Sequence, residues 1–181
     1  MTVLKGAAVL LLLFVAMPAF PESLWINVPF VRQPRDGCGA ASVAMVMQYW
    51  AGQEHRPVTT TEEVESIQKR VFSSRLHGAT PAALEGYLHD HGYLTFAVKG
   101  SWQELDEEIR KGRPLIVALR PAAQRALHYV VIDGIDTKRG LVMMNDPELR
   151  KLLPEGRKQF EKEWGATHNW MLLAVPRQAN S

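Results

Sequence analysis

The sequence predicts an α+β domain in which a helical half comes first and packs against an antiparallel sheet. Three observations support this prediction. A nearly uncharged stretch with helical spacing follows Cys38, and signals for the start of further helices recur as far as Ser101. From Leu115 onward, short apolar runs of strand character alternate with loops, and two of them flank a short loop that ends at Gly140. This order, helices first and strands last, is the basis of the α+β assignment.

The composition is that of one ordinary globular domain. The chain has 181 residues, 46% of them hydrophobic and 22% charged, which is enough for a single domain with a real core. The net charge is +2. Without residues 1–21, where Lys5 is the one charged side chain, 20 basic residues face 19 acidic ones. This balance gives no argument for a nucleic-acid partner, and the single cysteine excludes a disulfide within the chain.

Residues 1–21 are predicted to be an export signal or an N-terminal membrane anchor. Lys5 precedes an apolar run, Gly6–Phe20, which has the length of a signal-peptide core and is short for a membrane span. The residues before the expected cleavage point fit such a site only in part, so an uncleaved anchor with membrane association is the alternative. Both interpretations place the domain, residues 22–176, in the periplasm or outside the cell, followed by a polar tail at 177–181.

The domain is predicted to begin with an edge strand and a buried helix. Leu24–Val31 alternates polar and aliphatic residues and contains Pro29, which is tolerated at a sheet edge. After the loop Gln33–Gly37, apolar residues recur at helical spacing up to Trp50 and also fill the other faces. A helix that is apolar nearly all round is buried in the middle of a domain. Cys38 is therefore expected to begin the central helix.

Three further helices are predicted from their capping residues. In Thr59–Phe72, overlapping Thr-x-x-Glu capping boxes mark the first turn. A loop is expected at Ser73–Ala79. The helix in Thr80–Gly92 begins with threonine followed by proline, the preferred pair for an N-cap and first helical position. The helix in Ser101–Gly112 has a capping box at its start and a glycine at its end.

The remaining elements are mostly strands. Leu115–Leu119 is a continuous apolar run, as expected of a buried strand. Leu127–Ile135 and Leu141–Asn145 flank Asp136–Gly140, and two strands around a short loop with glycine indicate a β-hairpin. The other predicted elements are strands at Leu94–Val98 and Trp170–Val175 and a weak helix at Glu155–Trp164.

Cys38 is the candidate nucleophile. Free backbone N–H groups at the start of a helix favour a thiolate, and Gly37 and Gly39 leave room for another backbone to approach the sulfur. Gln33, five positions upstream, is placed to aim its side-chain amide at an oxyanion beside that sulfur. The alternative is a structural cysteine buried under a loop, which is the more usual role of a free cysteine.

His128 is the candidate base. A nucleophilic cysteine needs a base, and the base needs a group that orients it. His128 begins an apolar strand, where a polar ring is either a satisfied core histidine or a functional one. Asp146 ends the return strand of the same hairpin, where a carboxylate can hold an imidazole on the neighbouring strand. His89 and His91 resemble a metal pair, but they end a predicted helix, where histidine complements the helix dipole; no metal site is predicted.

The register of the hairpin decides which residue orients His128. Side chains alternate along a strand, so Asp133 points to the other face, and Asp136 lies too far along the strand. If Asp136 belongs to the loop, Asp146 shares the face of His128 and lies diagonally across from it. If Asp136 belongs to the strand, Asn145 takes that face and Asp146 turns away. The residues of the hairpin permit both registers.

Two stretches together resemble the bacterial peptidase C39-like family. They are Val28-Pro29-Phe30 leading to Gln33 and Asp36-Gly37-Cys38-Gly39-Ala40-Ala41-Ser42, and later His128-Tyr129-Val130-Val131 with Asn145-Asp146-Pro147. In order and spacing the similarity covers Leu24–Val175. It implies a papain-like fold and thiol peptidase chemistry without a cofactor. The roles it implies are Cys38 as nucleophile, His128 as base, Asp146 as its orienter in preference to Asn145, and Gln33 as oxyanion donor.

The resemblance leaves the substrate and two other functions open. Its best-known members are fused to ABC exporters and cut leader peptides after a double glycine, and these 181 residues contain no transporter. The predicted partner is therefore only a peptide or protein substrate. One alternative is a catalytically silent module that binds a peptide and does not cut it. The other is an acyltransferase that uses the same residues to pass an acyl group to an amine.

Overall fold

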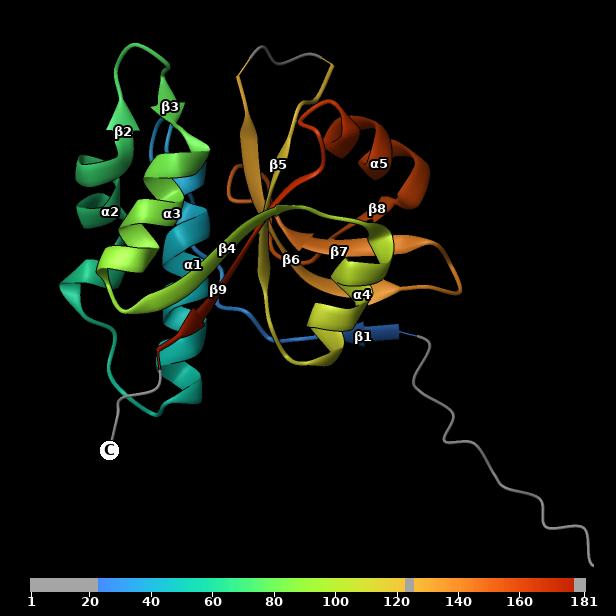
Figure 1. Cartoon of the computed structure of the whole chain (residues 1–181), viewed down its shortest axis with the longest axis horizontal. Coiled ribbons are helices and arrows are strands. Elements are labelled where there is room, and N and C mark those ends of the chain that lie inside the picture. The colour runs from blue at the N-terminus through green and yellow to red at the C-terminus, as the bar shows by residue number, and fades with distance from the viewer. Residues whose placement is uncertain (1–22, 123–125, 178–181) are drawn as a thin grey trace, which may run out of the picture.

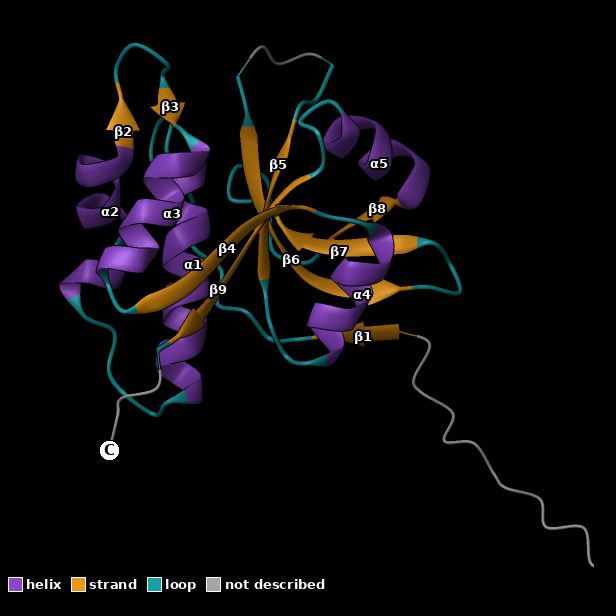
Figure 2. Cartoon of the chain, viewed as in Figure 1, coloured by secondary structure: helices purple, strands orange, loops and turns teal. Residues whose placement is uncertain are grey.

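An antiparallel sheet lies between two groups of helices in the computed structural model (Figures 1 and 2). The structure describes residues 23–122 and 126–177, and within them the sheet has seven strands. Across the sheet these are β4 (Tyr93–Lys99), β9 (Trp170–Pro176), β5 (Leu115–Leu119), β6 (His128–Asp136), β7 (Leu141–Asn145) and β8 (Leu153–Gly156), with β1 (Ser23–Trp25) paired to β6. The helices are α1 (Cys38–Gln53), α2 (Val64–Val71), α3 (Pro81–Asp90), α4 (Trp102–Arg110) and α5 (Arg157–Gly165). The predicted α+β class is confirmed.

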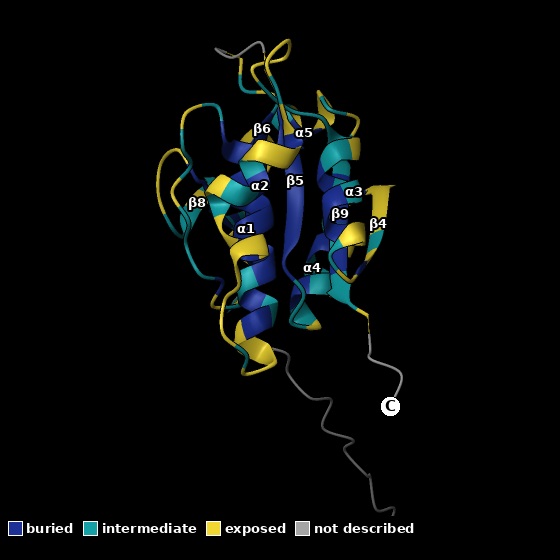
Figure 3. Ribbon diagram, turned by 90° about the vertical axis from the view of Figure 1, so that its left-hand side faces the viewer, coloured by how far each residue is buried: buried dark blue, intermediate teal, exposed yellow. Residues whose placement is uncertain are grey.

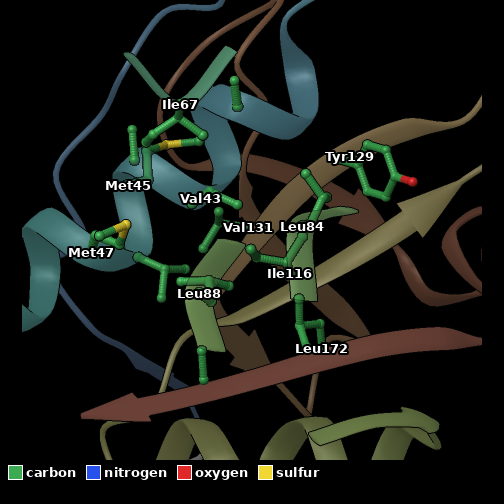
Figure 4. Close-up of a cluster of buried hydrophobic side chains, with 14 of the residues drawn as sticks. Val43, Met45, Met47, Ile67, Leu84, Leu88, Ile116, Tyr129, Val131 and Leu172 are labelled. Carbon is green, nitrogen blue, oxygen red and sulfur yellow. The ribbon is translucent and has the colours of Figure 1, made fainter. Parts of the chain in front are cut away.

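Each face of the sheet carries its own hydrophobic core. Helices α1, α2 and α3 cover one face, and their side chains pack against Ile116, Val131 and Leu172 of the sheet (Figures 1 and 4). Helices α4 and α5 cover part of the other face, where Trp164 joins a second cluster. The predicted helical half is therefore the group α1–α3, and the sheet separates it from α4 and α5.

Helix α1 is the buried helix that the sequence predicts. Its first ten residues are all buried, and Figure 3 shows it dark blue along most of its length beside β5. The glycines that flank Cys38 lie in close contact with their neighbours. A Cβ on Gly37 would lie 2.7 Å from the Cγ of Pro34, and a Cβ on Gly39 would lie 3.0 Å from a methyl carbon of Leu84. The turn before Cys38 therefore fits tightly against its neighbours.

The predicted strand Leu24–Val31 is much shorter in the structure. Pairing ends at Trp25, and the last ladder-like bond is donated by the backbone N–H of Ile26 to the carbonyl oxygen of Asp133 (2.7 Å). The chain then leaves the sheet and leads to α1. Val28 is buried in the hydrophobic core to which the side chains of α1 also belong. Since Pro29 has no N–H to donate, it cannot extend the ladder.

Three segments after α1 differ from their predictions. The capping box of Thr59 and Glu62 exists, but it begins a 3₁₀ turn, η1 (Thr60–Glu62), and the extended Glu63 separates this turn from α2. In place of the expected loop Ser73–Ala79, two short strands of two residues each, β2 (Phe72–Ser73) and β3 (Gly78–Ala79), pair to form a hairpin. Near the C-terminus, the expected helix Glu155–Trp164 begins at Arg157, because the residues before it form β8 and pair with β7.

The hairpin of β6 and β7 contains a register shift that decides the position of Asp146. Asp136 pairs with Leu141, so the loop is shorter than Asp136–Gly140 and the predicted register is wrong at the turn. A bulge at Asp133, between Ile132 and Gly134, then shifts the register by one residue, and Val131 pairs with Asn145. The shift restores Asp146 to the face that carries His128.

Asp133 is a fully buried carboxylate whose oxygens have no hydrogen-bond partner in any other described residue. Burial raises its pKa to about 7, against smaller opposing effects of Lys151 and of its own backbone N–H. Because the folded state binds this proton more tightly than the unfolded state, stability falls as the pH rises from about 4 through 7.

In the variant Asp133→Asn this pH-dependent loss of stability disappears. We therefore expect the unfolding free energy of the variant, relative to wild type, to rise by about 2–3 kcal/mol between pH 5 and pH 8.

Denaturant unfolding of both proteins at the two pH values measures this difference. Other titrating groups act in both proteins and cancel in the comparison. A constant difference between the two pH values would mean that Asp133 stays ionised in the folded state.

Candidate active site

Cys38 lies where the start of α1 meets the start of β6. It is the first residue of the helix, and its side chain is 9% exposed. The Sγ donates a long hydrogen bond to the carbonyl oxygen of Leu127 (3.9 Å), the residue before His128. Cys38 and Leu127, which are 89 positions apart in the sequence, are thus brought together by packing α1 across the sheet.

His128 is held between Asp146 and Cys38. Its Nε2 lies 3.0 Å from Oδ2 of Asp146, and both side chains are buried. Burial alone would lower the pKa of His128, but hydrogen bonds and charge interactions with Asp146 and Cys38 outweigh it and raise the pKa well above that of a free imidazole. With Nε2 bound to the carboxylate, Nδ1 is the ring nitrogen left for the sulfur. The imidazole is therefore fixed in orientation and readily holds a proton.

Asp146 is fixed by the turn that follows β7. Its Oδ1 accepts hydrogen bonds from the backbone N–H groups of Glu148 (2.9 Å) and Leu149 (3.1 Å), which leaves Oδ2 for His128. Burial would raise the pKa of Asp146, but His128 and the two N–H donors lower it below the usual value. The carboxylate therefore stays ionised beside the imidazole.

Asn145, the alternative orienter, points to the other face of the sheet. Its side-chain nitrogen donates to the carbonyl oxygen of Val28 (3.3 Å), and its oxygen accepts from the backbone N–H of Leu152 (3.0 Å). The residue is completely buried. Asn145 therefore joins the segment before α1 to the segment before β8, and the structure places Asp146 against His128.

Gln33 belongs to a loop that is tied to the turn after Asp146. Its backbone N–H donates to the carbonyl oxygen of Pro147 (3.0 Å), and the neighbouring Arg32 donates to the carbonyl oxygens of Glu148 and Leu149. The side-chain Oε1 of Gln33 is buried and has no hydrogen-bond partner within residues 23–122 and 126–177. The loop before Cys38 and the turn that holds the carboxylate thus form one connected unit.

The family resemblance implies that Gln33 is an oxyanion donor, so Gln33→Ala is expected to lower kcat by about 10²–10³-fold, the usual effect of removing one such donor. KM should change little, because the oxyanion forms only in the transition state. The rate of Cys38 alkylation by iodoacetamide, measured beside the peptidase assay, serves as the control and should stay within a few-fold of wild type. An unchanged kcat would mean that Gln33 only shapes the loop.

A cavity of about 300 Å³ adjoins the histidine and was not predicted from the sequence. His128 and Asp146 form part of its wall, together with three glutamates, Glu148, Glu155 and Glu163. These glutamates come from a turn, from β8 and from α5, so no spacing in the sequence relates them. The pairing of β7 with β8 and the packing of α5 against the sheet bring them together.

The weaker histidine signals belong to the structure of α3. His91 stacks on Tyr87 with 4.0 Å between ring centres, and its Nδ1 lies 2.7 Å from the carbonyl oxygen of the same residue. His89 is exposed beside Asp90. Over the described residues, no three His, Cys, Asp or Glu side chains are grouped so as to hold a metal ion.

Solved structures with the same fold include several peptidases. A protein from Bacillus anthracis described as a C39-like peptidase has a TM-score of 0.66 and 19% identity, covering 88% of this chain and 100% of its own. The peptidase domain of Streptococcus ComA, a bifunctional ABC transporter involved in quorum sensing, has a TM-score of 0.65 and 19% identity, with 83% and 100% covered. Xylellain, a cysteine protease from Xylella fastidiosa, has a TM-score of 0.63 and 11% identity, with 88% of each chain covered.

The sequence comparisons agree with this fold. A search of curated proteins found no match. The family model described as the Peptidase_C39 like family matches residues 25–171, which include Cys38, His128 and Asp146. The predicted resemblance is therefore confirmed, and so is the papain-like fold. This chain belongs to the peptidase C39-like family.

Proposed function

We propose that this protein is a cysteine peptidase that hydrolyses a peptide bond in a peptide or protein outside the cytoplasm. The observation that carries the proposal is the set of contacts around His128: its Nε2 lies 3.0 Å from Oδ2 of Asp146, and the Cys38 thiol hydrogen-bonds the carbonyl oxygen of the preceding residue, Leu127. A module that only binds a peptide gains nothing from a cysteine, an imidazole and a carboxylate arranged in series. The placement therefore supports an enzyme over a silent binding module.

In the first half of the reaction, the Cys38 thiolate attacks the carbonyl carbon of the scissile bond. The negative charge that develops on the carbonyl oxygen is stabilised by the Cys38 backbone N–H, which is free at the first position of a helix, and by the Gln33 amide. The imidazolium of His128 gives its proton to the leaving nitrogen as the C–N bond breaks. The products are a free amine and a thioester on Cys38.

In the second half, neutral His128 takes a proton from a water molecule that attacks the thioester. The C–S bond breaks, the acid product leaves, and the thiolate–imidazolium pair is restored. Asp146 keeps the ring in one orientation through both halves and stabilises its positive charge. An amine that attacks in place of water would give acyl transfer, and the mass of the product distinguishes the two reactions.

Location outside the cytoplasm is part of the proposal and depends on residues 1–21, which lie outside the described residues. Their basic residue and apolar run support export, by a cleaved signal or by a retained anchor. Over residues 23–122 and 126–177, no helix is both long enough and apolar enough to span a membrane.

The proposal is tested by comparing the N-termini of extracytoplasmic proteins in the native host with those of a strain that carries Cys38→Ala. New N-termini that depend on Cys38 would identify the substrate and the cleaved bond. Labelling of Cys38 by an electrophilic thiol probe, which should depend on His128, is the matched measurement on the purified protein. Identical N-termini in both strains, together with slow labelling that is insensitive to His128→Ala, would contradict the proposal.

A further inference from the structure

The cavity beside His128 combines an apolar wall with carboxylates. Leu119, Met144 and Leu153 line it, and so do Glu148, Glu155 and Glu163. Its volume of about 300 Å³ is at the lower end of the range for a pocket that holds a small molecule or a side chain. An extended aliphatic chain that ends in a cation matches both features, because its stem contacts the apolar wall while its charged end reaches the carboxylates.

The three glutamates of the cavity lack a basic partner in the described part of the chain. Glu155 is half-buried on β8, and burial, with the nearby charges of Glu163 and Asp146, raises its pKa. Among the described residues, the one side-chain partner of Glu163 is the neutral amide of Gln159, at 2.6 Å. The described residues form no metal-binding group here. The negative charge is therefore better matched by an organic cation than by a metal ion.

The position of the cavity relates it to one side of the scissile bond. Its lining includes His128 and Asp146 but neither Cys38 nor Gln33. In the reaction described above, His128 protonates the leaving nitrogen, which belongs to the segment that follows the scissile bond. That segment must begin at the imidazole, so its first side chains lie closest to the cavity.

We infer that this cavity binds a lysine or arginine side chain of the substrate at the first or second position after the scissile bond. The inference rests on the proposed peptidase function, which it extends to substrate preference. Glu155 and Glu163 determine this preference by attracting the cation. They take no part in bond breaking.

The first test measures cleavage specificity. A mixture of peptides of known sequence is digested with wild type, with Glu155→Gln/Glu163→Gln and with Glu161→Gln, and the cleaved bonds are identified by mass spectrometry. Glu161 is the matched control, because it lies on the same helix, outside the cavity, and pairs with Arg157. We expect lysine and arginine to be enriched after the bond by about five- to tenfold in wild type and control, and not in the double variant.

The second test measures binding without turnover. Wild type and the double variant are titrated calorimetrically with Lys-Ala-Ala amide and with norleucine-Ala-Ala amide, which has a similar length but no side-chain charge. Both peptides present the free amine that a cleaved segment would have. The lysine peptide should bind wild type about five- to tenfold more tightly than the norleucine peptide, and the two should bind the double variant equally.

The two tests separate the inference from the proposed function. A preference for the lysine peptide in binding, without cleavage by wild type, would uphold the cavity and contradict the peptidase. Cleavage without enrichment of basic residues would uphold the peptidase and overturn the inference. Failure of both titration peptides to bind wild type, or a preference that survives in the double variant, would also overturn it.

Discussion

Cys38→Ala will give a folded protein that has lost at least about 10⁴-fold in kcat, since the nucleophile of a catalytic set cannot be replaced by its neighbours. The side chain is small and already packed in the first core, so its loss leaves only a small void. We expect the unfolding free energy to fall by about 1–2 kcal/mol. Hydrolysis of the peptides that wild type cleaves, with far-ultraviolet circular dichroism as the folding check, measures both effects.

Ser42→Ala provides the matched control for this prediction. Ser42 lies one turn along α1, is fully buried, and its Oγ has no hydrogen-bond partner among the described residues. Its replacement removes one heteroatom from the same helix without touching His128 or Asp146, so the control should keep wild-type kcat. Turnover by Cys38→Ala at the wild-type rate would show that the thiol is structural, which is the alternative left open by the sequence.

The helix that carries Cys38 could be predicted because its features are local. A nearly uncharged apolar helix must be buried over most of its surface. Once the position of such a helix is known, the position of the residue at its start is known as well. The same holds for α3, which begins at Pro81 after the N-cap Thr80 as predicted. Other predicted elements failed because their ends depend on partners elsewhere, such as the strand that stops at Trp25.

The hairpin shows why the site was harder to predict than the fold. The sequence permits two registers for this hairpin. In the structure Asp136 belongs to the strand. With strict alternation of side chains, that register would turn Asp146 away from His128. The bulge at Asp133 corrects this by one residue. It is stabilised by neighbours that are distant in sequence: β1 lies against it, and a Cβ on Gly134 would lie 2.8 Å from the Cβ of Trp25. The alternation of polar and apolar residues within the hairpin gives no information on these contacts with β1.

Other parts of the site depend on tertiary packing alone. The hydrogen bond from Gln33 to Pro147 joins two loops more than 100 residues apart. The cavity glutamates Glu155 and Glu163 come from different elements. The family resemblance placed the residues that share a motif, Cys38, His128, Asp146 and Gln33, but it has no information on residues outside those motifs. We propose that features of this kind determine substrate preference, and finding them requires the structure.

Asp146→Ala is expected to lower kcat by about 10³–10⁴-fold, because it removes the group that fixes the orientation and the charge of His128. The variant should also shift the alkaline limb of the pH–rate profile. In wild type, Asp146 contributes to the raised pKa of His128. Without the carboxylate this pKa falls, the imidazolium needed to protonate the leaving nitrogen is lost at lower pH, and the limb moves towards neutral pH. A residue that merely supported the fold would lower activity without moving this limb.

Asn145→Ala is the paired variant, and its expected effect is on stability. It removes the hydrogen bonds to Val28 and Leu152 and leaves the buried carbonyl group of Val28 without its partner, at a cost of about 1–3 kcal/mol, and the half-buried N–H of Leu152 without its partner at a smaller cost. Its kcat per folded molecule should stay within a few-fold of wild type, with an unchanged alkaline limb. To show which residue orients His128, the rates of both variants are measured on one peptide. Each rate is corrected for the folded fraction, which is obtained from denaturant unfolding. A severe loss of kcat in Asn145→Ala, with Asp146→Ala nearly normal, would overturn the assignment of Asp146 as the residue that orients His128.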